Sequence, residues 1–141
     1  RQTMYDGGVR VPFMLRWPAM VKPGVSDAFV CQMDLLASFA GLLGQTYPDK
    51  LDSRNTLKAF LGKSKKGREE LVIEGMFNYA YRKGDWALIP PYRKQTEYQL
   101  YNLKEDIGQK HNLADKYPKK VKELTDEFEA LKLSTGKKTR F

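Results

Sequence analysis

The chain has 141 residues, of which 41% are hydrophobic, 12% aromatic and 30% charged, and its formal net charge is +8. This composition allows a packed core and excludes a disordered chain. No apolar run approaches the roughly 20 residues that a membrane-spanning helix needs. One cysteine and one histidine exclude an internal disulfide and a zinc site of the usual kind.

Residues 9–17 are a short apolar segment after a Gly-Gly pair, and they predict a strand. Pro12 lies near its start, where a missing N–H is tolerated. Residues 31–43 predict a helix that ends at Gly44. Its expected buried face comprises Met33, Leu35, Leu36, Phe39, Ala40 and Leu43. A second, shorter helix is expected over 56–61, ending at Gly62.

Residues 63–70 are a charged segment that contains glycine, and they predict a linker. Beyond it, four short segments alternate with turn residues, which predicts an antiparallel meander. The predicted strands are 71–74, 79–82, 86–89 and 98–103. A closing amphipathic helix is predicted over 118–132. Its apolar face comprises Val121, Leu124, Phe128 and Leu131.

The order of these elements predicts the edge of an α/β unit followed by a small α+β subdomain. In that division residues 1–62 end an α/β domain, 63–70 form the linker, and 71–141 form a subdomain of meander and helix. The chain opens at Arg1 without an initiator methionine or a signal peptide. We therefore expect a piece of a longer protein, in which case the missing signal says nothing about location.

The positive charge is unevenly distributed. Residues 1–55 carry six basic and five acidic side chains, a net charge of +1, whereas residues 56–141 carry nineteen and twelve, a net charge of +7. A basic region suits a polyanionic partner such as a sulfated glycan, a nucleic acid or an anionic lipid. It also describes an ordinary solvated surface, because the lysines alternate with glutamates. Both interpretations stay open.

The segment Tyr5-Asp6-Gly7-Gly8-Val9-Arg10-Val11-Pro12 closely resembles a signature of the sulfatase family, in which an aromatic residue and an acid precede Gly-Gly and Arg-x-Pro. Later motifs follow in the family's order. They are Trp17-Pro18, Pro23-Gly24, Asp34-Leu35-Leu36, Gly84-Asp85-Trp86-Ala87-Leu88-Ile89, Gln99-Leu100-Tyr101-Asn102-Leu103 and Asn112-Leu113-Ala114. The resemblance covers nearly the whole chain, and it is to the C-terminal third of arylsulfatases and of N-acetylgalactosamine-6-sulfatase-like enzymes.

The resemblance implies the C-terminal end of an alkaline-phosphatase-like sulfatase fold, with a small antiparallel sheet packed by a helix. It also implies a parent enzyme that hydrolyses sulfate esters of sugars or aryl alcohols in an extracytoplasmic compartment. The family's nucleophile is a formylglycine and its metal is usually calcium, which hard oxygen ligands suit. We expect both to be supplied by upstream sequence.

Within this chain, the resemblance implies substrate contacts at three positions. Arg1 lies where the family has a sulfate-contacting lysine, and an arginine can hold an anion by bidentate contacts. Gly7 and Gly8 either form a tight turn that needs positive φ or allow the backbone to approach the substrate. Cys31 lacks the modification motif, so we expect an ordinary thiol, and we assign no catalytic role to His111.

We expect no metal ligand in this segment, no nucleic-acid partner and no membrane anchor. The expected partners are a sulfated carbohydrate or aryl sulfate, and the missing N-terminal catalytic domain. Without that domain, the apolar surface of residues 1–55 would be exposed or covered by a second copy of the chain. The alternative function is a non-catalytic basic module that binds sulfated glycans. Phosphate esters also remain open as substrates, because related phosphatases share the larger fold.

Overall fold

The computed structural model describes residues 4–48, 51–75, 78–92 and 95–134. The chain forms two compact units. We call Arg1–Val11 together with Glu70–Phe141 the sheet unit, and Pro12–Glu69 the helical unit. The predicted role of residues 1–62 as the end of a catalytic domain stays a prediction.

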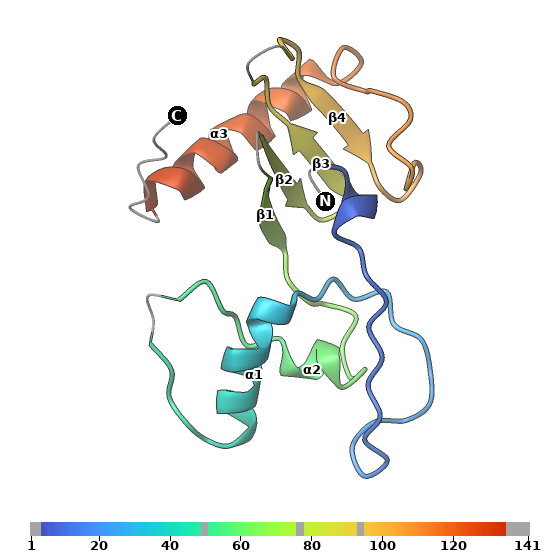
Figure 1. Ribbon diagram of the computed structural model, residues 1–141, viewed down its shortest axis with the longest axis vertical. Coiled ribbons are helices and arrows are strands. Elements are labelled where there is room, and N and C mark those ends of the chain that lie inside the picture. The colour runs from blue at the N-terminus through green and yellow to red at the C-terminus, as the bar shows by residue number, and fades with distance from the viewer. Residues whose placement is uncertain (1–3, 49–50, 76–77, 93–94, 135–141) are drawn as a thin grey trace. The chain divides into compact units, whose positions relative to one another are not determined.

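The sheet unit contains four antiparallel strands that lie side by side in chain order (Figure 1). The strands are β1 (Glu70–Glu74), β2 (Tyr79–Lys83), β3 (Trp86–Ile89) and β4 (Gln99–Asn102). All four strands predicted from the sequence are confirmed. The turn between β2 and β3 has two residues, and its first residue, Gly84, has a φ of 55°, which glycine adopts without steric cost.

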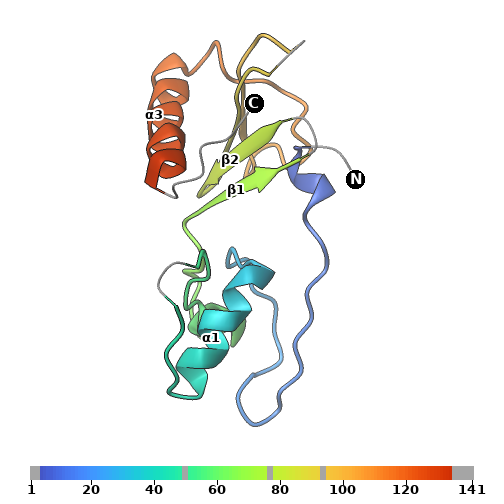
Figure 2. The same cartoon turned by 60° about the vertical axis from the view of Figure 1, so that its left-hand side comes forward.

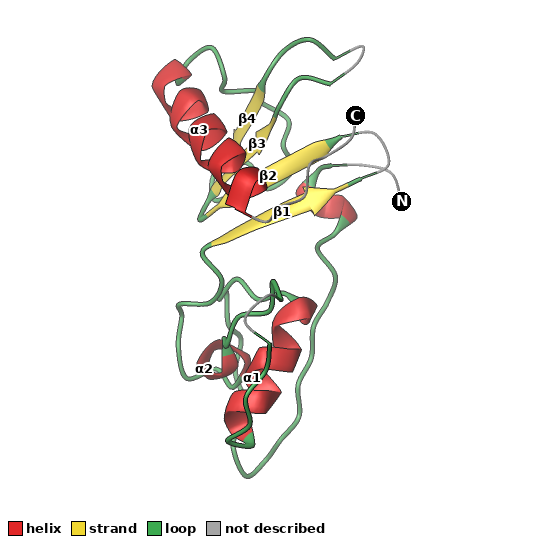
Figure 3. Ribbon diagram, turned by 90° about the vertical axis from the view of Figure 1, so that its left-hand side faces the viewer, coloured by secondary structure: helices red, strands yellow, loops and turns green. Residues whose placement is uncertain are grey.

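Residues alternate between the two faces of this sheet along every strand. Each face packs against another part of the chain. On one face Tyr81, Leu88 and Leu100 pack against Leu124 and Phe128 of α3 (Pro118–Ser134). The predicted closing helix and its apolar face are therefore confirmed. Figures 2 and 3 show α3 lying along this side of the sheet. Burying a large apolar side chain contributes about 1.5–3 kcal/mol, so this layer stabilises the unit strongly.

The opposite face is covered by the beginning of the chain. Met4 packs against Ala80, Ala87 and Ile89 there. The short 3-10 helix η1 (Asp6–Gly8) follows directly, and Figure 1 shows it in blue, on the other side of the sheet from α3. The N-terminal motif is thus part of the sheet unit, although more than 60 residues separate it from β1.

The outer edge of β4 is closed by a side chain. Asn112 Oδ1 accepts hydrogen bonds from the N–H groups of Leu100 (2.9 Å) and Ala114 (3.0 Å), and Asn112 Nδ2 donates to the Tyr98 carbonyl (3.0 Å). These contacts take the place of a fifth strand, since an edge strand otherwise presents unpaired backbone groups. The Asn112-Leu113-Ala114 motif therefore has a structural role within this chain.

The helical unit contains η2 (Gln32–Asp34), α1 (Leu35–Leu42) and α2 (Leu57–Phe60), joined by long loops (Figure 3). The predicted end of the first helix at Gly44 is confirmed: Gly44 has a φ of 64°, and the Gln45 N–H donates to the Ala40 carbonyl at 2.8 Å. The predicted end of the second helix at Gly62 is confirmed by a φ of 67°.

The strand predicted over 9–17 is wrong for this chain. Residues 10–16 form neither strand nor helix, and Met14 is 91% exposed. A strand needs a neighbour for its N–H and C=O groups, and none of the described residues pairs with this segment as a strand.

The buried face predicted for the first helix is also wrong here. Leu36, Phe39 and Leu43 are exposed, with 52% to 70% of their surface accessible, whereas Ala37 and Ser38 on the other side are fully buried. The buried side is fixed by polar contacts to the loop before α2. Ser53 Oγ accepts from the Ala37 N–H at 2.9 Å, and Ser38 Oγ accepts from the Thr56 N–H at 3.0 Å.

A buried ion pair completes the helical unit. Asp34, which has no exposed surface, pairs with Arg68 and accepts a hydrogen bond from the Arg54 N–H at 2.9 Å. Arg68 also donates to the Asp52 carbonyl at 3.0 Å. Asp34 lies directly before the first residue of α1, but its carboxylate binds an arginine and makes no capping hydrogen bond to the helix. This unit is held by polar contacts, since much of its apolar surface is exposed.

Candidate functional site

The Tyr5–Arg10 segment forms a tight turn on the sheet unit. The Gly8 N–H donates to the Tyr5 carbonyl at 2.9 Å, and the Arg10 N–H donates to the Asp6 carbonyl at 2.8 Å. The turn at Gly7 and Gly8 was predicted, but the positive φ was not needed: of the described glycines, Gly44, Gly62 and Gly84 have it. A Cβ on Gly7 would meet no atom within 4 Å. Packing among the described residues therefore does not explain why position 7 is glycine.

Asp6 is the centre of the site. It is 4% exposed and it pairs with two arginines: Arg10 Nε lies 2.6 Å from Oδ2, and Arg82 Nη1 lies 3.0 Å from Oδ1. Arg10 of the motif therefore pairs with a carboxylate four residues earlier in the same segment. Burial lowers the pKa of Arg82, and the charge of Asp6 opposes this shift. Two cations around one carboxylate leave a local positive charge on the turn, which favours an anion.

Two glutamines also hold the turn. Gln109 Oε1 accepts a hydrogen bond from the Asp6 N–H at 2.5 Å, and Gln99 Oε1 accepts one from the Tyr5 hydroxyl at 3.0 Å. The Tyr5 ring packs edge-on against Tyr101 at 6.1 Å. Sequence reasoning missed Arg82, Gln99 and Gln109, because nothing in the chain order brings residues 76 to 103 positions apart together.

The other candidates lie elsewhere. Arg1, at the family's sulfate-contacting position, lies outside the described residues. Cys31 is a partly buried free thiol. The His111 side chain is 79% exposed, and its Nδ1 lies 3.4 Å from Asp106.

Asp106 has a structural role in the loop after β4. Its Oδ2 accepts hydrogen bonds from the N–H groups of His111 and Lys110, each at 2.8 Å. The backbone hydrogen bond from His111, followed by that from Lys110, holds the pKa of Asp106 below its ordinary value. Asp106 and His111 therefore fix a turn of this loop.

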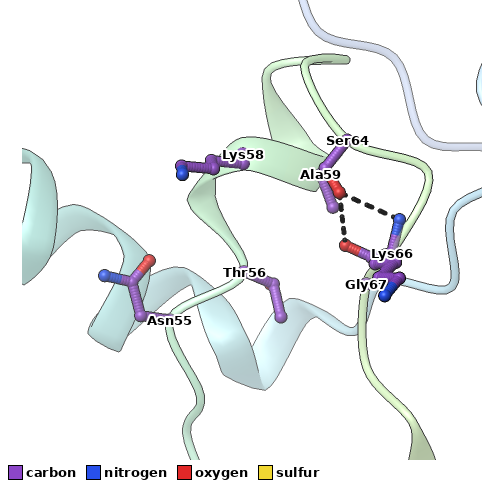
Figure 4. Close-up of a pocket in the computed structure, with 7 residues that line it drawn as sticks. All are labelled: Asn55, Thr56, Lys58, Ala59, Ser64, Lys66 and Gly67. Atoms are coloured by element: carbon purple, nitrogen blue, oxygen red, sulfur yellow. Dashed lines mark hydrogen bonds between the residues drawn. The ribbon is translucent and has the colours of Figure 1, made fainter.

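One surface depression lies within the helical unit. It has a volume of about 390 Å³ and is lined by residues from the 55–59 and 64–67 segments, as Figure 4 shows. Its polar side chains are those of Asn55, Thr56, Lys58, Ser64 and Lys66. Ser64 Oγ is already bonded to the backbone of Lys66, accepting from its N–H at 3.0 Å. The depression contains no carboxylate and no nucleophile paired with a base, so it offers an anion a positive surface and nothing more.

The described part of the chain has no cluster of three or more His, Cys, Asp or Glu side chains that could hold a metal ion. Within the same residues, no helix combines the length and the apolar character needed to cross a membrane.

Comparison with known proteins shows that the chain is similar to the C-terminal parts of sulfatases. Residues 1–134 match a family described as N-sulphoglucosamine sulphohydrolase, C-terminal. An N-acetylgalactosamine-6-O-sulfatase of Bacteroides thetaiotaomicron is 36% identical to the chain over 94% of its length, which corresponds to 29% of the relative. The chain thus spans less than a third of this curated relative.

Solved structures agree with this match. One, described with the metabolism of multiple glycosaminoglycans by Bacteroides thetaiotaomicron, has a TM-score of 0.75 and 35% identity over 84% of this chain and 28% of its own. Another, solved with its substrate D-glucosamine-2-N,6-O-disulfate, has a TM-score of 0.66 and 25% identity over 88% of this chain and 28% of its own. The sheet packed by a helix is the arrangement expected of a sulfatase C-terminal region.

Proposed function

This chain belongs to the N-sulphoglucosamine sulphohydrolase C-terminal family of sulfatases, and we propose that it is the C-terminal part of a longer enzyme that hydrolyses sulfate esters. The observation that carries the proposal is the family match over residues 1–134, combined with relatives and structures of which the chain covers less than a third. The remainder of such a protein is where the sulfatase chemistry would lie.

The proposed substrates are sulfated sugars. One relative is named for a galactosamine 6-sulfate activity, and one solved structure holds a disulfated glucosamine as its substrate. Sulfated amino sugars are therefore the first substrates to test. Aryl sulfates serve as general reporters of sulfate-ester cleavage.

The proposed division of labour follows the chemistry that cleavage needs: a nucleophile aimed at sulfur, a cation beside the sulfate oxygens and an acid for the leaving alcohol. By family resemblance, upstream sequence would supply the formylglycine nucleophile and the calcium ligands. This segment would supply contacts to the sulfate through Arg1 and through the backbone of Gly7 and Gly8. The absence of any atom near a Cβ on Gly7 supports the last contact, because open space there admits a ligand.

The rest of the longer protein is also the proposed cover for the helical unit. The exposed apolar side chains of 11–17 and of α1 would pack against it, and a second copy of the chain is the competing cover. By the same resemblance, we propose an extracytoplasmic location.

The test compares the longer protein with this chain alone. The longer protein should hydrolyse 4-nitrophenyl sulfate and glucosamine or galactosamine 6-sulfate, with lower activity on the matching phosphate esters. Residues 1–141 alone should show no turnover with or without calcium. Phosphatase activity about tenfold above sulfatase activity would replace the proposed reaction with phosphate-ester hydrolysis, since one fold can host both.

A second candidate function is a basic module that binds sulfated glycans, and one observation favours it. Three lysines on α3 form ion pairs within the helix, among them Lys120–Glu123 and Lys122–Asp126, each at 2.6 Å. By contrast, no ion pair among the described residues involves the exposed lysines around the depression. These are Lys58, Lys63, Lys65 and Lys66.

Binding of heparin to the purified chain distinguishes this candidate. If the module binds glycans, Lys58→Glu with Lys66→Glu should abolish binding, whereas Lys120→Glu with Lys122→Glu should preserve it. Equal losses in the two pairs would indicate attraction to the net charge alone, which salt screens.

A further inference from the structure

The contacts of Asp6 lead beyond the residues of the N-terminal motif. We define the Asp6 network as Asp6, Arg82 and Gln109. Arg82 comes from β2 and Gln109 from the loop after β4, so both partners belong to the C-terminal part of the sheet unit. The turn at Gly7 and Gly8 is therefore placed by residues far along the chain, and not by its own local sequence alone.

Gln109 is held at a conformational cost. Its φ of 50° makes it the one described residue other than glycine with positive φ. A residue other than glycine in this region costs of order 1–3 kcal/mol, and such strain gathers at functional sites. Its Nε2 is buried and has no hydrogen-bond partner among the described residues, which adds a further cost. In return, its Oε1 binds the Asp6 N–H.

Arg82 is costly in a different way. Its side chain is 16% exposed, so its charge has lost much of its hydration, and Asp6 supplies a carboxylate partner. The neighbouring Lys83 also forms an ion pair, with Glu127 of α3, on a side chain that is 41% exposed. Adjacent residues of β2 thus form two ion pairs, one with the N-terminal turn and one with the closing helix.

The Asp6 network holds a segment of backbone at Gly7 that has no side chain. Gly7 is exposed and a Cβ there would touch none of the residues that the structure describes, although the turn does not need glycine for its φ angles. A strained and buried support under an open glycine turn is the arrangement expected when the backbone must be held in place for close approach by a ligand.

We propose that Arg82 and Gln109 are positioning residues for the sulfate-ester site, which fix the backbone of Gly7 and Gly8 through Asp6 without touching the substrate. The inference rests on the proposed function. It means that residues of the C-terminal subdomain place the backbone proposed to bind sulfate. Such placement matters for the rate, because misplacement by about 1 Å can reduce a rate by a factor of order 100.

The first experiment compares adjacent residues of β2 in the longer protein. Arg82→Met and Lys83→Met each remove one ion pair, and their melting temperatures record the structural loss. We expect Arg82→Met to lower kcat/KM for 4-nitrophenyl sulfate by about tenfold or more and to raise the Ki of inorganic sulfate, whereas Lys83→Met should stay within about twofold. Arg82→Lys should restore part of the loss, because it keeps the charge beside Asp6.

The second experiment separates positioning from stability. Gln109→Gly relieves the positive φ and removes the hydrogen bond to the Asp6 N–H, so the two effects on stability oppose each other. The melting temperature should change by less than about 3 °C, while kcat/KM should fall by about fivefold. A loss of activity without a loss of stability is a result that a purely structural role does not produce.

The inference is overturned if Gln109→Gly keeps the kcat/KM and sulfate Ki of the unmodified protein. It is equally overturned if Arg82→Met and Lys83→Met lose the same activity. Failure of the proposed function is seen separately, as an unmodified longer protein that cleaves no sulfate ester.

Discussion

In the sheet unit, the large apolar side chains lie between layers, whereas in the helical unit many of the corresponding side chains lie on the surface. Leu88 and Leu124 have no exposed area, but Leu36 and Phe39 are each more than half exposed. Both units contain apolar segments with regular periodicity, so the difference is in what covers them. The sheet unit supplies its own cover from α3 and Met4, and the helical unit is held by a buried ion pair and hydroxyl contacts.

Removal of the buried ion pair between Asp34 and Arg68 should have the largest effect on the stability of the helical unit. Asp34→Ala should destabilise the helical unit by about 3–5 kcal/mol, because it leaves Arg68 buried without its carboxylate. Amide exchange at Ala37 and Thr56 should accelerate while the strands stay protected. The exposed carboxylate of Asp27 gives the control, and Asp27→Ala should change stability by less than about 0.5 kcal/mol. Unchanged exchange in Asp34→Ala would show that the pair does not hold this unit.

The core under α3 provides the matching change in the sheet unit. Leu124→Ala or Phe128→Ala should cost about 2–5 kcal/mol, the usual effect of truncating a large buried side chain. Leu133 lies on the same helix and is 82% exposed, so Leu133→Ala should have little effect. Denaturant unfolding measures both. A loss below about 0.5 kcal/mol in both core variants would show that this layer is not the source of stability.

The difference between the sheet unit and the helical unit explains which features could be predicted from the sequence. The strands, the closing helix and its Leu124 and Phe128 face depend on neighbours inside the chain, so their periodicity predicted them correctly. The 9–17 segment and the face of α1 show the same kind of periodicity, yet both predictions of burial failed. An apolar pattern predicts that a surface packs against other residues. It does not show whether those residues belong to the same chain.

The site divides in the same way. Asp6 and Arg10 belong to one motif and lie four positions apart, so the sequence already places them close together. Arg82 and Gln109 could not, because only the packing of β2 and the loop after β4 brings them to the turn. The positive φ of Gln109 is a property of the backbone, and the pattern of side chains does not predict it.

A change of pH should affect one loop of the sheet unit selectively. The N–H groups of His111 and Lys110 hold the pKa of Asp106 below its ordinary value of about 3.9. The stabilisation is therefore complete above about pH 4 and is lost as the pH falls through the lowered pKa. Amide exchange at Lys110 and His111 should accelerate there, and Asp106→Asn should remove this pH dependence. An unchanged dependence in Asp106→Asn would assign it to another group.

The smallest expected effect concerns the exposed face of α1. Leu36→Ser with Phe39→Ser should change the stability of this chain by less than about 0.5 kcal/mol, because both side chains are already exposed. Ala37→Leu gives the control on the buried side of the same helix, where overpacking should cost about 1–3 kcal/mol.

The same double substitution should have a large effect on association. An exposed apolar face favours dimers or aggregates, so the unmodified chain should associate in sedimentation experiments and the substituted chain should sediment more nearly as a monomer. In the longer protein, where the face is proposed to be covered, the substitution should instead cost several kcal/mol, in the range of about 2–5 for each truncated core side chain. A dilution-stable monomer of the unmodified chain, with slow amide exchange throughout residues 9–17, would show that the helical unit needs no cover. That result would remove the main physical reason for regarding this chain as part of a longer fold.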